Sequence, residues 1–86
     1  MFELKGRTAL ITGSTQGIGF VIAKILSDYG AKVFVHGATS MKKSRRAAEK
    51  IADSIPICVD LLKNDAVKSV YDLTGDVDIL VLNASV

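Results

Sequence analysis

A glycine-rich octet near the N-terminus, Thr-Gly-Ser-Thr-Gln-Gly-Ile-Gly over residues 12–19, constrains this chain more than any other feature. An apolar, strand-like run over residues 8–11 leads into it, and apolar residues at helical spacing follow it. Glycines at a strand-to-helix junction let the backbone turn tightly and approach a ligand closely, because no Cβ stands in the way. The free N–H groups and positive dipole end of the following helix point at the same place. The octet therefore predicts a pyrophosphate site, and a glycine-rich turn without a ligand is the alternative.

Four strand-like runs alternate with three helical patterns along the chain. We expect strands over residues 8–12, 32–36, 55–59 and 78–82, and helices over residues 18–29, from a cap at Ser40 to about Asp53, and from a cap at Asn64 to Gly75. This alternation indicates parallel βαβ units. The expected fold class is α/β, as the first half (βαβαβαβ) of a Rossmann-type doubly wound parallel sheet. In such a sheet the carboxyl ends of the strands meet at one crevice, where ligands bind.

Composition places the chain among globular domains. Its 86 residues are 49% hydrophobic and 23% charged, with a formal net charge of +2. No apolar run approaches the roughly 18 residues needed to cross a membrane, and the first residues do not resemble a secretory signal. The single cysteine, Cys58, excludes an internal disulfide and favours a reducing cytoplasm. Its apolar neighbours indicate a buried core thiol rather than a nucleophile. We expect a cytoplasmic protein with neither a nucleic-acid nor a membrane partner.

The octet has the spacing G-x-x-x-G-x-G, whereas the general dinucleotide fingerprint is G-x-G-x-x-G. It resembles the cofactor loop of the short-chain dehydrogenases/reductases. Residues 4–7 resemble that family's lead-in to the first strand, and residues 59–61 its third-strand segment that meets the adenine. Residues 78–85 resemble its fourth-strand stretch, D-I-L-V-N-N-A-G. Two departures stand out there, because Leu82 replaces the first Asn and Ser85 replaces the Gly.

The resemblance implies that contacts to a dinucleotide come from the four strand ends. The expected cofactor-binding residues are Gly13, Ser14, Thr15, Gln16, Gly17, Ile18, Gly19, His36, Gly37, Ala38, Asp60, Leu61, Asn83, Ala84 and Ser85. The adenine would meet Asp60 and its neighbour, and the nicotinamide side would meet residues 83–85, for which an ordinary strand-end turn is the alternative. His36 is expected either to approach the ribose or phosphate or to be a partly exposed residue at a strand end. No metal ligands are expected.

Residues 36–40 bear on the choice of cofactor. They contain no carboxylate, whereas NAD-specific sites place one at the end of the second strand to bind the ribose hydroxyls. Four cations follow, Lys42, Lys43, Arg45 and Arg46, which either contact a phosphate or form a solvated helix face. The Arg that many NADP-dependent members carry after the second strand is Ala38 here. NADP is thus favoured by elimination, with NAD as the alternative.

The residues that perform the family's chemistry are absent from this sequence. That chemistry uses a Tyr-x-x-x-Lys pair with a Ser, and neither Tyr29 nor Tyr71 has a Lys four residues on, so both are expected to be packing residues. We expect residues 1–86 to be the N-terminal portion of a longer Rossmann domain and to contain no catalytic residue. The resemblance implies an NAD(P)-dependent oxidoreductase that passes hydride between the nicotinamide and a carbonyl or alcohol substrate, assembled as a homo-oligomer. A non-catalytic dinucleotide-binding or sensing module is the alternative.

Overall fold

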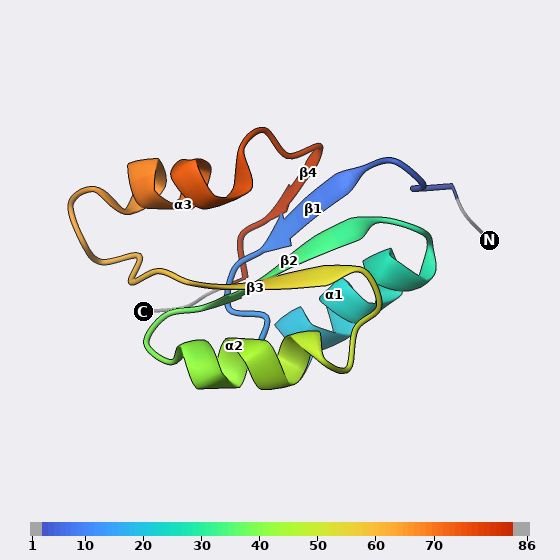
Figure 1. The fold of residues 1–86 in the computed structure, drawn as a ribbon, viewed down its shortest axis with the longest axis horizontal. Helices are drawn as coiled ribbons and strands as arrows, with labels where there is room; N and C mark the ends of the chain where they lie inside the picture. The colour runs from blue at the N-terminus through green and yellow to red at the C-terminus, as the bar shows by residue number, and fades with distance from the viewer. Residues whose placement is uncertain (1–2, 84–86) are drawn as a thin grey trace.

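The structure is a computed structural model, and it describes residues 3–83. Strands and helices alternate in the order β1 (Thr8–Ile11), α1 (Gly17–Asp28), β2 (Lys32–Gly37), α2 (Met41–Ala48), β3 (Ser54–Cys58), α3 (Ala66–Thr74) and β4 (Ile79–Val81). The four strands form one sheet in the order β3-β2-β1-β4, and every pair is parallel. Helices α1 and α2 lie on one side of the sheet and α3 on the other (Figure 1). The predicted α/β fold of Rossmann type is confirmed.

Helices cover both faces of the sheet, and successive side chains of each strand point to opposite faces. On the face toward α1 and α2, the buried strand residues are Ala9, Ile11, Val33 and Val35, packed with Ala23, Ala31, Ala47 and Ile51. On the face toward α3, Leu10, Phe34 and Ile57 form a smaller cluster with Val70 and Val77. The two central strands, β1 and β2, therefore pack against helices on both faces. Because the strands are parallel, the segments after their carboxyl ends lie at the same edge of the sheet.

Two helices differ from their predicted bounds for local reasons. The Ser40 hydroxyl accepts a hydrogen bond from the Lys43 N–H, which confirms the predicted cap of α2. That helix ends at Ala48 instead of near Asp53, and the Ser54 hydroxyl lies within hydrogen-bond distance of the carbonyls of Ala48 and Ile51. Helix α3 begins after Asp65 and not after Asn64, whereas its end at Gly75 is as predicted, with a φ of 65° that favours glycine.

Several apolar side chains on the helices are exposed. On α1, Ile22 and Leu26 pack against the core, whereas Ile18, Val21 and Ile25 are 74%, 54% and 49% exposed. On α3, Val70 packs inward, but Val67 and Tyr71 are exposed. Both tyrosines fail the packing prediction, since Tyr29 and Tyr71 are 39% and 56% exposed. Within residues 3–83, no helix is long and apolar enough to cross a membrane.

Candidate cofactor site

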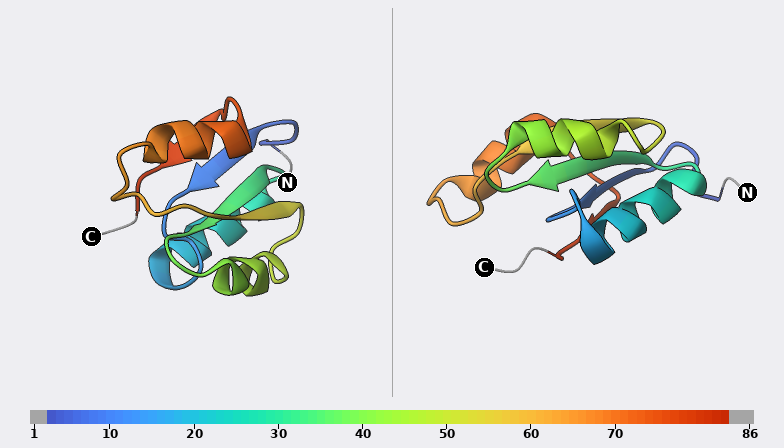
Figure 2. Two further views of the ribbon diagram at one scale, coloured as in Figure 1. Left: turned by 60° about the vertical axis from the view of Figure 1, so that its left-hand side comes forward. Right: turned by 90° about the horizontal axis from the view of Figure 1, so that it is seen from below.

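The glycine loop joins the carboxyl end of β1 to the start of α1, as Figure 2 shows. Gly13 and Gly17 have φ values of 62° and 64°, in the left-handed region that L side chains rarely adopt. The side chain of Gln16, the residue before α1, makes no capping hydrogen bond. The first turn of α1 thus keeps N–H groups that an anion can bind.

Gly19 lets the first turn of α1 pack directly on the loop. A Cβ at this residue would overlap the carbonyl oxygen of Gly13 and would lie 2.5 Å from Nδ2 of Asn83. The Asn83 amide Nδ2 in turn donates to the Gly13 carbonyl at 3.0 Å, and the Asn83 N–H donates to the Thr12 hydroxyl at 2.9 Å. The structure therefore brings Gly13, Gly19 and Asn83 together at one place.

His36 lies inside the sheet, and the prediction of a partly exposed strand-end residue is wrong. Its exposed fraction is 0%, because β2 continues to Gly37 and pairs with β3 at both residues. The ring Nδ1 accepts a hydrogen bond from the Gly13 N–H at 2.9 Å, and Nε2 lies 2.8 Å from the Val59 carbonyl oxygen. A direct contact with a ribose or phosphate would need an exposed ring atom, which His36 does not offer.

Ser14 supports the loop from within. Its hydroxyl donates to the Ile11 carbonyl at 2.7 Å and accepts from the His36 N–H at 2.9 Å, and the residue is fully buried. The hydroxyl therefore does not face a ligand. The outer surface of the loop is formed by the next residues, among which Gln16, Gly17 and Ile18 are exposed and Thr15 is half-buried.

The remaining predicted contacts lie along the ends of β2, β3 and β4. Gly37 is buried against α2, where a Cβ would lie 2.5 Å from the Ser44 hydroxyl, and Ala38 is exposed beside it. Asp60 and Leu61 follow β3 and are half-buried. The Asp60 carboxylate accepts from the Leu62 N–H at 3.0 Å. The other two predicted contacts, Ala84 and Ser85, lie outside the described residues.

Cys58 departs from its prediction. The thiol is half-buried rather than buried in the core. It lines a cavity of about 430 Å³ together with Asp60, Lys63 and Asp65. Among the described residues, no group of three or more His, Cys, Asp or Glu side chains could hold a metal ion.

A second cavity, of about 340 Å³, lies between the glycine loop and α2. It is lined by Thr15, Gln16, Phe20, Lys43, Arg46, Ala47 and Lys50. Three of these are cations spaced three and four residues apart, so they share one side of their segment. Within residues 3–83, none of the three forms an ion pair. Lys50 was missed from the sequence, although its spacing from Lys43 could have identified it.

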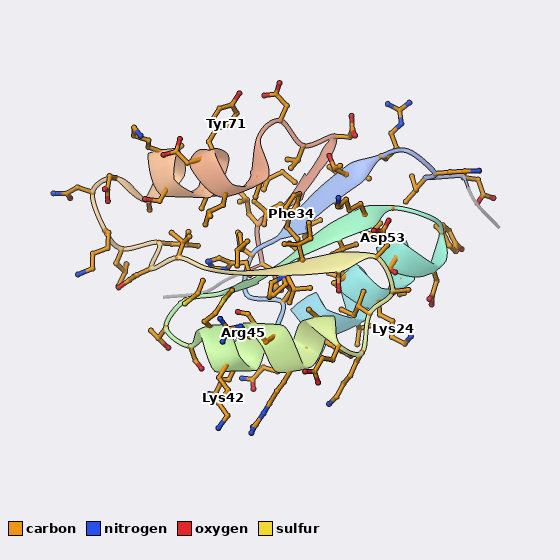
Figure 3. The ribbon with its side chains drawn as sticks, viewed as in Figure 1. Lys24, Phe34, Lys42, Arg45, Asp53 and Tyr71 are labelled. Carbon is orange, nitrogen blue, oxygen red and sulfur yellow. The ribbon has the colours of Figure 1, made fainter. Side chains whose placement is uncertain are left out.

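The other two predicted cations do not line this cavity. Lys42 points away from the sheet, as Figure 3 shows, and Arg45 is exposed on the same helix. Lys43 and Arg46 of the basic run thus line the cavity beside the glycine loop, whereas Lys42 and Arg45 lie outside it.

Tyr71 lies on α3 and points away from the sheet (Figure 3). Its hydroxyl donates to the Asp76 carboxylate at 3.0 Å. This hydrogen bond, with the negative charge of Asp76, raises the pKa of Tyr71 above its ordinary value. The side chain lines an apolar groove with Leu61 and Leu82, on the opposite side of the sheet from α1 and α2.

The sequence and the fold both match known proteins. The model of the short chain dehydrogenase family matches residues 7–86. The chain is 38% identical over 87 residues to the 3-oxoacyl-(acyl-carrier-protein) reductase FabG of Rickettsia prowazekii, covering all of this chain and 36% of that protein. A solved short chain dehydrogenase/reductase family protein superposes with a TM-score of 0.92 at 36% identity, over 99% of this chain and 36% of that one.

A ketoreductase provides a further comparison. The landomycin C-6 ketoreductase LanV, solved with bound NADP and rabelomycin, gives a TM-score of 0.82 at 35% identity. It aligns with 99% of this chain and 40% of its own. The chain thus spans little more than a third of the length of the curated relatives that it matches.

Proposed function

The chain belongs to the short chain dehydrogenase family, and on that premise we propose that it binds NADP(H) for hydride transfer between the nicotinamide and a carbonyl or alcohol carbon. The observation that carries this proposal is the glycine loop. Its Gly19 packs on the Gly13 carbonyl, and the Asn83 amide holds the same carbonyl in place. NAD is the alternative cofactor, and a dinucleotide sensor without turnover is the alternative function.

The residues of the loop suit a pyrophosphate. A Cβ at Gly17 would meet no atom within 4 Å, so the outer side of the loop is open. Backbone N–H groups of the first turn of α1 would bind the anionic oxygens, and the positive end of the helix dipole would favour them. When bound, the cofactor supplies the hydride chemistry, and these residues hold it and orient it.

The preference for NADP is supported by charge. Ala38 and Thr39 stand where an NAD-specific site would carry a carboxylate, and both are exposed. In the cavity beside the loop, Lys43, Arg46 and Lys50 offer cations with no carboxylate partner among the described residues. A 2′-phosphate there would gain charge-assisted hydrogen bonds. The relative solved with bound NADP also supports this choice.

The substrate class follows the relatives and not a pocket in this chain. Two of them are described as a 3-oxoacyl-(acyl-carrier-protein) reductase and a landomycin C-6 ketoreductase. We therefore propose a small-molecule carbonyl or alcohol substrate. The proposal also includes a cytoplasmic location and a homo-oligomeric assembly.

The cofactor proposal is tested with paired double variants of α2. Replacing Lys43 and Arg46 by Ala should weaken NADP binding at least about tenfold to a hundredfold, the range of a single charged hydrogen bond of about 1.5–3 kcal/mol. NAD binding should change by less than about threefold, because NAD has no 2′-phosphate. The control replaces Lys42 and Arg45, which removes the same charge from the same helix outside the cavity. Equal losses for both dinucleotides, or equal losses in both double variants, would contradict the 2′-phosphate assignment.

The activity is tested in the full-length protein with a panel of carbonyl substrates. Oxidation of NADPH that depends on a ketone is the expected result. Tight dinucleotide binding without turnover on any substrate would favour the sensing alternative. Absence of dinucleotide binding would refute the proposed function itself.

A further inference from the structure

His36 forms hydrogen bonds with two consecutive residues of the glycine loop. Its ring Nδ1 accepts from the Gly13 N–H, its carbonyl oxygen accepts from the Ser14 N–H, and its own N–H donates to the Ser14 hydroxyl. The other ring nitrogen lies beside the Val59 carbonyl. One buried residue of β2 therefore joins the loop after β1 to the segment after β3.

We propose that His36 is a positioning residue for the cofactor, which acts through Gly13 and only as the neutral tautomer with its proton on Nε2. The proposal rests on the proposed function, since it assumes that the loop binds a dinucleotide. His36 itself does not touch the ligand, because it is fully buried.

The tautomer follows from the partners. A backbone N–H can only donate, so the Gly13 N–H at 2.9 Å requires a lone pair on Nδ1. A carbonyl oxygen can only accept, so Val59 at 2.8 Å requires a proton on Nε2. A doubly protonated ring would set one N–H against another at Gly13. Among the described residues, no buried side-chain nitrogen or oxygen lacks a partner, which agrees with a satisfied neutral ring.

The position of Gly13 matters because the loop is fixed there from two strands. On one side, the Gly13 N–H is held by His36 of β2, and on the other, its carbonyl is held by Asn83 after β4. Gly19 of α1 packs on that same carbonyl. A displaced Gly13 would therefore displace the first turn of α1, whose N–H groups bind the pyrophosphate in the proposed function.

The test compares His36→Asn with His36→Leu. Asn offers an oxygen near the place of Nδ1, whereas Leu offers no acceptor. Affinity for NADP is measured for wild type and both variants under one set of conditions, so the two variants differ in the acceptor that they offer to the Gly13 N–H.

We expect His36→Asn to bind within about threefold of wild type and His36→Leu about threefold to tenfold more weakly, the range of one hydrogen bond. Equal affinities of His36→Leu and wild type, or no recovery of affinity in His36→Asn relative to His36→Leu, would overturn the proposal. Absence of NADP binding by wild type would refute the proposed function and the positioning role together.

A spectroscopic measurement tests the tautomer directly. His36 is the only histidine of these 86 residues, and comparison with His36→Asn identifies its ring signals in a nitrogen NMR spectrum. We expect the pattern of the neutral Nε2–H tautomer. An Nδ1–H tautomer would overturn the proposal.

Discussion

Gly19→Ala isolates the contact between α1 and the glycine loop. Alanine in a helix is favoured over glycine by up to about 1 kcal/mol, and Gly19 does not have the positive φ that would oppose a side chain. A substitution judged from helix propensity alone would therefore stabilise the protein. The structure predicts the opposite sign, because the new Cβ would overlap the Gly13 carbonyl and press on the Asn83 amide.

The magnitude follows from these opposed effects. Overpacking costs about 1–3 kcal/mol, and the loss of the Asn83–Gly13 hydrogen bond costs about 0.5–1.5 kcal/mol. After the gain from helix propensity, the free energy of unfolding should fall by about 1–3 kcal/mol. Denaturant unfolding with linear extrapolation measures this change. Cofactor affinity, followed by NADPH fluorescence, should fall as well because the loop moves.

Gly75→Ala is the matched control for this prediction. Gly75 ends α3 with φ 65° and ψ −157° and open space around it, so alanine there strains only the backbone, at about 1–3 kcal/mol. It should lower stability by a similar amount and leave NADPH affinity unchanged. The reasoning is refuted if Gly19→Ala is as stable as wild type and binds NADPH with equal affinity.

Two further predictions concern Asn83 and Tyr71. Asn83→Ala should lower the free energy of unfolding by about 1 kcal/mol, because the hydrogen bond to the Gly13 carbonyl is lost. Asn83→Asp should lower it further, because a carboxylate oxygen would face the Gly13 carbonyl. Denaturant unfolding measures both changes, and an Asp variant as stable as wild type would contradict the geometry. The pKa of Tyr71 is raised by its hydrogen bond to Asp76, so any stabilisation from this pair is present below the ordinary tyrosine pKa of about 10 and is lost as the pH rises through the raised value. An ultraviolet titration in a Tyr29→Phe background should show the Tyr71 midpoint falling in Asp76→Asn, and an unchanged midpoint would disprove the assigned cause.

The order of strands and helices could be predicted because its signals are local. Residues 8–11 and 32–36 are short apolar runs, and the octet between β1 and α1 has a spacing that few other turns share. The caps at Ser40 and Gly75 were also visible in sequence, since each depends on one residue type at a helix end.

The inward face of α1 could not be predicted, because apolar residues surround most of this helix. Ile18, Val21 and Ile25 have the same helical spacing as the residues that pack inward. The structure turns the small residues Gly19 and Ala23 toward the sheet, which lets the helix approach closely. Small size at the contact, rather than hydrophobicity, decided the orientation.

The role of His36 depended on long-range pairing. A histidine at the end of a strand-like run is expected to be half exposed, because sequence alone does not show how far the strand extends. Here the pairing of Gly37 with Cys58 prolongs β2 and encloses the ring. Its two partners, Gly13 and Val59, each lie 23 residues away, on opposite sides of it in the chain.

The hydrogen bond between Asn83 and Gly13 joins residues 70 apart, so it has a consequence for how the chain folds during synthesis. The loop emerges from the ribosome early, yet its carbonyl partner is among the last of the described residues to be made. A contact between residues so far apart in sequence forms late in folding, because the chain between them must first lose conformational entropy. A ligand that binds only the finished loop therefore favours the assembled sheet by mass action. A dinucleotide bound at this loop, as proposed, would thus favour chains in which residues 12–83 have assembled over chains that have not yet reached Asn83.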